Sequence, residues 1–194
     1  KKTMRAYGAE LILTSAEKTI EYSRTYAKEL AAEKGYFLLN QFDNPDNWKA
    51  HYQTTGPEIW EATEGQVTHF ISAMGTTGSI TGIGTYLKEK DSQIQIIGAQ
   101  PSEGSKIAGI RAWSPELLPK IYDDSKVDQK VYIHQSEAEE GARRLAREEG
   151  ILTGASGGGA YTIAQKIASQ LDRGTVVFIV CDRGDRYLST DLFG

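Results

Sequence analysis

The stretch Ser72-Ala73-Met74-Gly75-Thr76-Thr77-Gly78-Ser79 decides how the rest of the chain is interpreted. It follows an apolar, strand-like run at residues 67–71 and precedes a helix-like run at residues 80–90. The glycines therefore fall in a strand-to-helix turn, where loop amides and a helix N-terminus can bind a phosphate group. A plain turn of glycine and threonine is the alternative, and this loop alone does not decide between the two.

Composition and charge exclude several classes of protein. The chain has 194 residues, of which 39% are hydrophobic and 25% are charged, as in ordinary soluble globular proteins. Its net charge of -4, without a block of Lys and Arg, argues against a nucleic-acid surface. No apolar run approaches the roughly 20 residues that span a bilayer, and no signal-type segment follows the first residues. We expect a cytoplasmic protein with no nucleic-acid or membrane partner.

The residues that most often bind metals are too few and too scattered for a metal site. The single cysteine, Cys181, ends an apolar run, so we expect it to be buried rather than reactive. The histidines, His51, His69 and His134, lie far apart and lack the spacing of metal ligands. We therefore expect neither a disulfide within the chain nor bound zinc.

Helices and strands alternate along the chain, which predicts an α/β fold with a parallel sheet covered by helices. Capping boxes at Thr14/Glu17 and Ser136/Glu139 predict the starts of two helices, and Gly35 and Gly150 predict their ends. A loop rich in Asn, Asp and Pro places a domain boundary near residue 45. The predicted strands are residues 10–14, 36–39, 67–71, 94–100, 127–133 and 175–180.

Two further segments resemble parts of a binding crevice. The loop at residues 154–159 contains three consecutive glycines just before a helix, each costing about 1 kcal/mol relative to Ala if helical, so something must approach the backbone there. Tight helix–sheet packing is the alternative to a ligand. Charged residues begin at Asp182, at the carboxyl end of a strand, where open α/β sheets bind ligands. Together the loops and the strand end describe a site for a phosphorylated planar ligand.

A long irregular connection at residues 101–119 contains Arg111 close to Trp113. Loops of this length in a compact domain are usually functional or mobile. A solvated arginine beside a packing tryptophan is the alternative to a ligand-binding pair.

These motifs together resemble the cysteine synthases, which are fold type II pyridoxal-phosphate enzymes, and among them the thiosulfate-accepting B form. The resemblance implies a tryptophan synthase β-like α/β fold with three-layer open sheets, incomplete in this chain. It implies that residues 1–45 belong to a smaller, mobile N-terminal domain and residues 46–194 to the larger cofactor-binding domain, in a protein that is a homodimer when intact. The motifs that carry it are Asn44-Pro45-Asp46-Asn47, Thr54-Thr55-Gly56-Pro57-Glu58-Ile59-Trp60, Gly75-Thr76-Thr77-Gly78-Ser79, Gly109-Ile110-Arg111, Gly154-Ala155-Ser156-Gly157-Gly158 and Cys181-Asp182-Arg183-Gly184-Asp185-Arg186-Tyr187-Leu188-Ser189-Thr190.

The resemblance also assigns roles to individual residues. Ser156 takes the position facing the pyridine nitrogen, where a hydroxyl, unlike a carboxylate, does not force protonation of the ring. Arg111 and the pair Cys181 and Asp182 match the B form, and a cation at the mouth attracts the thiosulfate dianion. The implied cofactor-binding residues are Gly75, Thr76, Thr77, Gly78, Ser79 and Ser156, and the implied substrate-binding residues are Gln41, Arg111, Cys181 and Asp182.

One departure from the family concerns catalysis. The Schiff-base lysine of the family and its Thr-Ser-Gly-Asn-Thr loop lie upstream of the matched region, so no catalytic residue is expected within this chain, which looks like the carboxyl-terminal two thirds of the enzyme. Without that lysine a base for removing the Cα proton is missing. We expect the polypeptide alone not to turn over O-acetylserine, and at most to bind pyridoxal phosphate weakly. Robust β-replacement by the purified chain would contradict this expectation.

The sequence therefore predicts a β-replacement that forms L-cysteine or S-sulfocysteine from O-acetyl-L-serine and sulfide or thiosulfate. Two alternatives remain open. Arg111 could instead bind the phosphate of O-phosphoserine, and comparing turnover of the two serine esters separates these enzymes. A non-catalytic binding module or partner subunit on the same scaffold is the third possibility, and the length of the encoded gene tests it.

Overall fold

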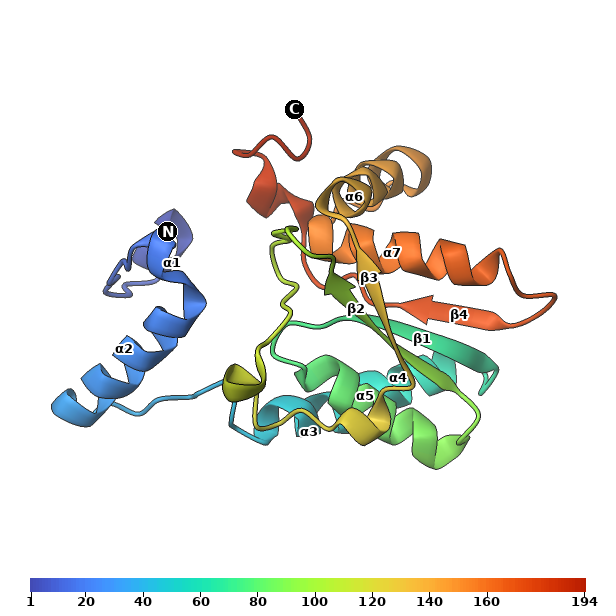
Figure 1. Cartoon of the computed structure of the whole chain (residues 1–194), viewed down its shortest axis with the longest axis horizontal. Coiled ribbons are helices and arrows are strands. Elements are labelled where there is room, and N and C mark those ends of the chain that lie inside the picture. Colours follow the sequence, from blue (N-terminus) through green and yellow to red (C-terminus); the bar gives the residue numbers. More distant parts are fainter. The chain divides into compact units, whose positions relative to one another are not determined.

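The computed structural model describes residues 1–194, except for the side chains of Ala16 and Thr19. The chain divides into two compact units, Lys1–Asn40 and Gln41–Gly194 (Figure 1). Asn40, the last residue of the first unit, has a φ of 47°, in the left-handed region that few residues other than glycine adopt. The change of unit thus falls within a few residues of the boundary expected near residue 45.

The regular elements that the structure describes in the first unit are helical. Helix α1 covers Lys2–Ala6, a 3-10 turn covers Ala16–Lys18, and helix α2 covers Thr19–Lys34 and ends at Gly35, whose φ is 68°. The strands predicted at residues 10–14 and 36–39 are wrong, because neither run has a strand partner in the described part of the chain. Large apolar side chains remain exposed in this unit: Met4, Tyr7, Ile12, Leu13, Tyr36, Phe37 and Leu39.

The predicted capping box at the start of helix α2 is also wrong. The Thr14 hydroxyl is 2.7 Å from the hydroxyl of Ser23, and the Glu17 amide donates to Ser15 Oγ at 3.3 Å. A 3-10 turn therefore precedes the α-helix where the sequence predicted an α-helix from the start.

The second unit contains a four-stranded parallel sheet in the order β3-β2-β1-β4 (Figure 1). Its strands are β1 (Val67–Ala73), β2 (Gln95–Pro101), β3 (Gln129–Ile133) and β4 (Thr175–Phe178). Because the strands are parallel, their carboxyl ends meet at one edge of the sheet, and the loops that follow them lie there.

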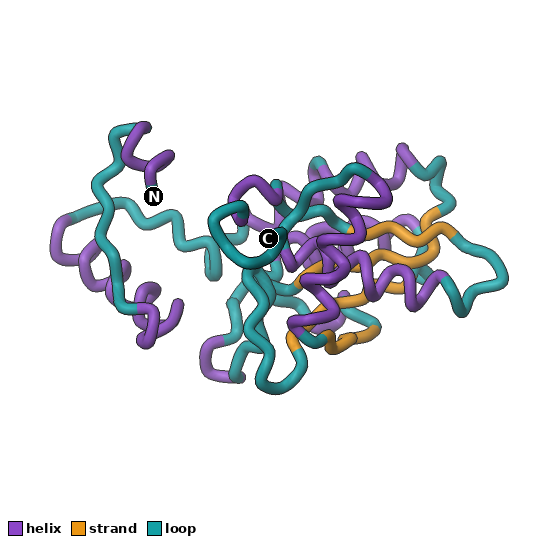
Figure 2. The backbone as a smooth tube through the Cα atoms, turned by 90° about the horizontal axis from the view of Figure 1, so that it is seen from above, coloured by secondary structure: helices purple, strands orange, loops and turns teal.

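Helices cover both faces of this sheet, as Figure 1 shows. Alternate residues of a strand point to opposite faces, so Phe70 and Ile71 enter different cores. Phe70 packs with α4 and α5, and Ile71 packs with α6 and α7. In Figure 2 the strands run together within this unit beside the helices. The predicted α/β fold is confirmed. The helices are α3 (Asp46–Gln53), α4 (Thr55–Ala62), α5 (Gly78–Lys90), α6 (Gln135–Glu149) and α7 (Ala155–Ala168).

Several local predictions need correction. Helix α3 occupies a segment predicted as the end of a loop, since Pro and Asn also begin helices. Helix α6 begins at Gln135, and its box is formed by Glu137 accepting from the His134 amide at 3.1 Å, not by Ser136 and Glu139. Strand β4 is half-buried and ends at Phe178, so the buried strand predicted to residue 180 is too long.

The three consecutive glycines have a packing explanation. A Cβ on Gly158 would lie 2.2 Å from the carbonyl oxygen of Ala138, and a Cβ on Gly141 would lie 2.3 Å from the carbonyl oxygen of Gly158. Helices α6 and α7 therefore touch backbone to backbone at this point. The glycines therefore allow a close contact between two helices. The packing alternative had predicted a contact between a helix and the sheet.

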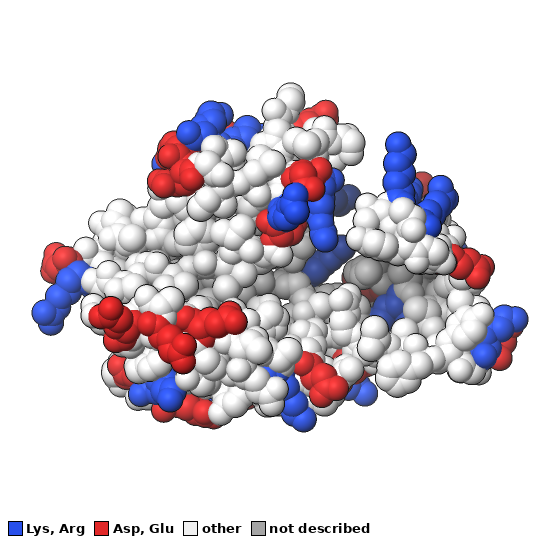
Figure 3. Space-filling view, turned by 180° about the vertical axis from the view of Figure 1, so that it is seen from behind, with Lys and Arg blue, Asp and Glu red and all other residues white. Residues whose placement is uncertain are grey.

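Charges of both signs are interspersed on the face that Figure 3 shows. On α6, Arg144 pairs with Glu148 at 2.9 Å, one turn away on the same helix. No helix in the described residues is long and apolar enough to cross a membrane. The same residues contain no group of three or more His, Cys, Asp or Glu that could hold a metal ion.

Candidate functional site

The loop between β1 and α5 leaves a run of backbone donors without acceptors. Thr77 precedes α5 with a φ of 72°, an uncommon value for a threonine, and this turns the chain sharply into the helix. Within the described part of the chain, the amides of Gly75, Thr76, Thr77 and Ser79 donate to no protein oxygen. Adjacent backbone amides in a turn at a helix N-terminus form a concave site for an anion.

Helix α3 supports the hydroxyl groups of this loop. Asn47 Nδ2 donates to Thr76 Oγ1 at 3.2 Å, and His51 Nε2 lies 3.0 Å from Ser79 Oγ. His51 Nδ1 lies 3.0 Å from Thr55 Oγ1, and burial lowers the pKa of His51, which favours the neutral ring. A neutral ring that accepts from Thr55 and donates to Ser79 leaves the Ser79 hydroxyl free to donate to a ligand.

Thr77 contributes to the loop differently from its neighbours. Its hydroxyl donates to the carbonyl of Thr76 at 2.5 Å, and the residue is only 3% exposed. Of the three hydroxyls expected to face a ligand, those of Thr76 and Ser79 are placed at the surface of the loop, whereas Thr77 offers its amide.

The long connection after β2 folds back onto this loop. The Arg111 amide donates to the carbonyl of Met74 at 2.8 Å, and Trp113 Nε1 donates to the carbonyl of Gly75 at 2.7 Å. A Cβ on Gly75 would lie 2.7 Å from the carbonyl oxygen of Gly109. Glycine is therefore required at position 75 by close contact between two loops.

Ser156 lies at the start of α7, next to the loops that follow β1 and β2. It belongs to the first turn of α7 and is 3% exposed. Gly109 has a φ of 88°, and a Cβ there would lie 3.1 Å from Ser156 Oγ. Residues that are far apart in sequence, in the loops after β1 and β2 and at the start of α7, are thus brought together at the carboxyl edge of the sheet.

Cys181 contacts Ser156 from the end of the β4 segment. The residue is exposed, which corrects the prediction that it is buried. Its thiol nevertheless lies among neighbouring atoms, and desolvation raises its pKa, with the negative charge of Asp182 acting in the same direction against a hydrogen bond from Ser156. The raised pKa keeps the sulfur protonated at neutral pH, which makes it a poor nucleophile.

The carboxylate of Asp182 accepts hydrogen bonds from three other residues of the chain. Oδ1 accepts from the Gly154 amide at 2.8 Å and from the Thr153 hydroxyl at 3.3 Å, and Oδ2 accepts from the Tyr187 hydroxyl at 2.5 Å. Burial, followed by this hydrogen bond to Asp182, raises the pKa of Tyr187 to about 12. Tyr187 therefore remains a hydrogen-bond donor across the physiological range.

The two glycine-rich loops are thus electrostatically different. The free amides of α5 have no carboxylate beside them in the described hydrogen bonds, whereas at the start of α7 the Gly154 amide already donates to the Asp182 carboxylate. A second anion at α7 would be repelled by that carboxylate. Of the two loops, the one at residues 75–79 therefore fits a phosphate group better.

Two predicted substrate residues have weaker structural support. Gln41 is exposed, and its carbonyl accepts from Asn47 Nδ2 at 2.7 Å, the same amide group that donates to Thr76. Arg111 is exposed, and its guanidinium has no ion-pair partner among the residues that the structure describes. The backbone of each residue is hydrogen-bonded beside the loop, Gln41 to Asn47 and Arg111 to Met74. Among the described contacts, none joins the side chain of either residue to the loop.

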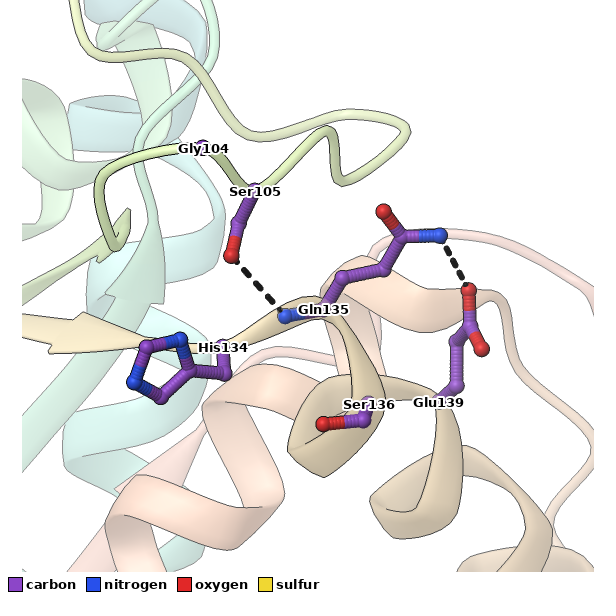
Figure 4. Close-up of a pocket in the computed structure, with 6 residues that line it drawn as sticks. All are labelled: Gly104, Ser105, His134, Gln135, Ser136 and Glu139. Atoms are coloured by element: carbon purple, nitrogen blue, oxygen red, sulfur yellow. Dashed lines mark hydrogen bonds between the residues drawn. The ribbon is translucent and has the colours of Figure 1, made fainter.

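A separate hollow lies between the loop after β2 and the start of α6, with a volume of about 360 Å³ (Figure 4). Its polar groups are largely paired with each other. The backbone amide of Gln135 donates to Ser105 Oγ at 3.2 Å, and its side-chain Nε2 donates to Glu139 Oε1 at 2.7 Å. The hollow contains none of the predicted site residues, and its lining is Gly104, Ser105, His134, Gln135, Ser136 and Glu139.

Comparison with known protein families identifies the scaffold. The family model described as "Pyridoxal-phosphate dependent enzyme" matches residues 1–182. The chain belongs to this family. A pyridoxal-phosphate enzyme must hold a phosphate dianion and a pyridine ring, and the free amides at residues 75–79 with the nearby Ser156 hydroxyl fit those two groups.

Individual members of the pyridoxal-phosphate family are also similar. The chain is 54% identical to cysteine synthase B of Pseudomonas aeruginosa over 193 residues and 53% identical to that of Escherichia coli over 191 residues. These matches cover 100% and 98% of the chain, but only 64% and 63% of the relatives. The structure of an O-acetylserine dependent cystathionine beta-synthase from Helicobacter pylori matches with a TM-score of 0.91 and 35% identity, covering 100% of the chain and 66% of that protein.

Sequence reasoning missed several residues of this pyridoxal-phosphate scaffold. Asn47 and His51 were given no role, although their spacing of one helical turn puts them on the same face of α3. Thr153 was also missed, and Tyr187 was named only as part of a motif without a role, because both meet Asp182 only through the fold.

Proposed function

We propose that this chain forms the cofactor-binding part of a pyridoxal-phosphate enzyme that makes L-cysteine or S-sulfocysteine. The observation that carries the proposal is the run of free amides at Gly75, Thr76, Thr77 and Ser79, within the unit that also presents Ser156. Hydrogen bonds to a charged group are worth roughly 1.5–3 kcal/mol each, so several donors can hold a phosphate even after ordering costs.

Each residue has a definite task in this proposal. The loop amides and the hydroxyls of Thr76 and Ser79 bind the phosphate, with His51 and Asn47 orienting those hydroxyls. Ser156 accepts or donates a hydrogen bond at the ring nitrogen without forcing its protonation. When bound, the cofactor supplies an electron sink for the bond-breaking at the substrate Cα.

The substrates are proposed from the relatives together with the exposed cation. The cysteine synthase B relatives support O-acetyl-L-serine as the amino-acid substrate and sulfide or thiosulfate as the sulfur donor. Arg111 is an exposed cation whose backbone amide donates to Met74, the residue before the loop at residues 75–79, and thiosulfate, as a dianion, gains more from such a charge than sulfide does. The same charge would suit O-phosphoserine, which remains the alternative substrate.

We also propose that the unit ending at Asn40 belongs to the smaller, mobile domain and that the unit beginning at Gln41 is most of the larger, cofactor-binding domain. A non-catalytic module or partner subunit on the same scaffold remains the alternative of another class. The homodimer and the cytoplasmic location stay predictions.

A chimera tests the proposed activity. The part of the Pseudomonas aeruginosa relative that the chain does not match is fused to the chain, giving a protein of the relative's length. We expect cysteine from O-acetylserine with sulfide and S-sulfocysteine with thiosulfate. A clear preference for O-phosphoserine would replace the proposed substrate. A chimera that binds pyridoxal phosphate but turns over neither ester would favour the non-catalytic module.

A further inference from the structure

We propose that Asp182 and Tyr187 are positioning residues, which hold the start of α7 so that the Ser156 hydroxyl is fixed at the ring of the cofactor. This inference rests on the proposed function, because it concerns the place of Ser156 in the cofactor site. It differs from the expectation that Asp182 forms the polar floor of the substrate pocket.

Helix α7 lacks a side-chain cap of its own. Its N-cap residue is Gly154, which has no side chain to accept from the helix amides. The carboxylate of Asp182 instead accepts from the Gly154 amide at 2.8 Å, as a glutamate does in a capping box. A Cβ on Gly154 would lie 2.4 Å from Tyr187 Cε2 and 2.9 Å from Asp182 Oδ2. The external cap therefore occupies the space that a side chain at position 154 would need.

The carboxylate of Asp182 is itself held in place by several hydrogen bonds. Tyr187 donates to Oδ2, and Tyr187 ends a 3-10 turn, Gly184–Tyr187, whose first amide donates to the carbonyl of Leu152 at 2.9 Å. Thr153, which donates to Oδ1, is 0% exposed. The carboxylate thus has donors on both oxygens from residues that are fixed by their own contacts.

Ser156 is closely surrounded by other parts of the chain. Ser156 follows Gly154 within the same helical turn, so a shift of the Gly154 backbone moves Ser156 with it. On the other side, only 3.1 Å separates Ser156 Oγ from the position of a Cβ on Gly109. Small displacements of α7 would therefore change the reach of the Ser156 hydroxyl, and hydrogen bonds weaken steeply with distance and angle.

The experiment compares Asp182→Ala, Asp182→Asn and Tyr187→Phe with the unaltered 194-residue chain. Two ligands are titrated separately: inorganic phosphate, which probes only the loop at residues 75–79, and pyridoxal phosphate, which also needs the ring position. The Gly154 and Ser156 amide signals in ¹⁵N–¹H spectra report the start of α7 without any ligand. A positioning role predicts a different outcome for the two ligands, whereas a general loss of structure weakens both.

For Asp182→Ala we expect about tenfold weaker binding of pyridoxal phosphate, because this corresponds to the loss of roughly one hydrogen bond to a charged or polar group. The affinity for inorganic phosphate should change less than about twofold. Asp182→Asn keeps an oxygen for the Gly154 amide and should restore most of the affinity. Tyr187→Phe should weaken pyridoxal phosphate by about threefold, and it also provides a test if Asp182→Ala does not fold.

Equal losses for the two ligands, or an unchanged affinity for pyridoxal phosphate, would overturn the inference. If the unaltered chain binds neither ligand, the proposed function fails independently. The positioning role then depends on the amide signals alone: it stands if Ser156 shifts in Asp182→Ala and returns in Asp182→Asn, and it falls if Ser156 does not move.

Discussion

Replacing Gly158 by alanine tests the contact between α6 and α7, on which the placement of the α7 start depends. The new Cβ would lie 2.2 Å from the Ala138 carbonyl oxygen and 2.3 Å from the Ala142 nitrogen, more than 1 Å inside the ordinary contact range that begins near 3.4 Å. These are backbone atoms, so no side chain can turn away, and the two helices must separate. Overpacking of this kind costs about 1–3 kcal/mol, which equals or exceeds the gain of about 1 kcal/mol from alanine in a helix.

The neighbouring glycine provides a matched control. Gly159 is equally buried in the same helix, but a Cβ there would have its nearest neighbours at 3.4 to 3.7 Å, which is ordinary contact. We expect Gly159→Ala to leave the free energy of unfolding unchanged or to raise it by up to about 1 kcal/mol. Urea denaturation followed by circular dichroism measures both variants. If Gly158→Ala is as stable as Gly159→Ala, the reasoning about the helix crossing is refuted.

Three further predictions concern the site and its surroundings. Ser79→Ala should weaken inorganic phosphate binding about tenfold or more, measured by calorimetry, whereas the same change at exposed Ser92 should have no effect, and equal affinities would contradict the role of the loop. The free energy of unfolding should fall as pH drops below 6.5, because burial lowers the pKa of His51 and His69 in the folded chain while the unfolded chain takes up protons at the ordinary value. His69→Gln should make this loss of stability smaller. A variant with the same pH profile as the unaltered chain would contradict the role of His69. In the chimera, Arg111→Met should reduce turnover with thiosulfate at least about fivefold relative to sulfide, and an unchanged ratio would remove Arg111 from substrate selection.

Much of the second unit could be predicted because its signals are local. The apolar run of β1, the two glycines and the following helix are contiguous in sequence, so the strand-to-helix turn follows from residues 67–90 alone. Gly35 and Gly150 ended their helices where expected, since left-handed helix ends favour glycine.

The wrong predictions concern features that depend on distant partners. The runs at residues 10–14 and 36–39 have strand-like composition, but a strand exists only where another strand supplies hydrogen bonds. Cys181 was expected to be buried because apolar residues precede it, yet β4 lies at an edge of the sheet and leaves the following residues exposed. Composition describes a segment, and its neighbours decide its burial.

The convergence of the site could not be predicted for the same reason. Gly109 faces Ser156, and Asp182 bonds to Gly154, across sequence separations that no local pattern records. Family resemblance assigned Asp182 to the substrate pocket, but only the structure shows that its oxygens are bonded to Thr153, Gly154 and Tyr187. The sequence therefore predicts candidate residues of the site, and the hydrogen bonds that connect them come from the fold.

The most direct test of the proposed cofactor site is a ¹⁵N–¹H titration of the assigned 194-residue chain with pyridoxal phosphate. The structure predicts saturable shifts of the four amides that have no acceptor, Gly75, Thr76, Thr77 and Ser79, and reversal of those shifts by excess inorganic phosphate. Shifts at the start of α7 without shifts at these four amides, or no saturable shifts at all, would contradict the assignment of the phosphate to this loop.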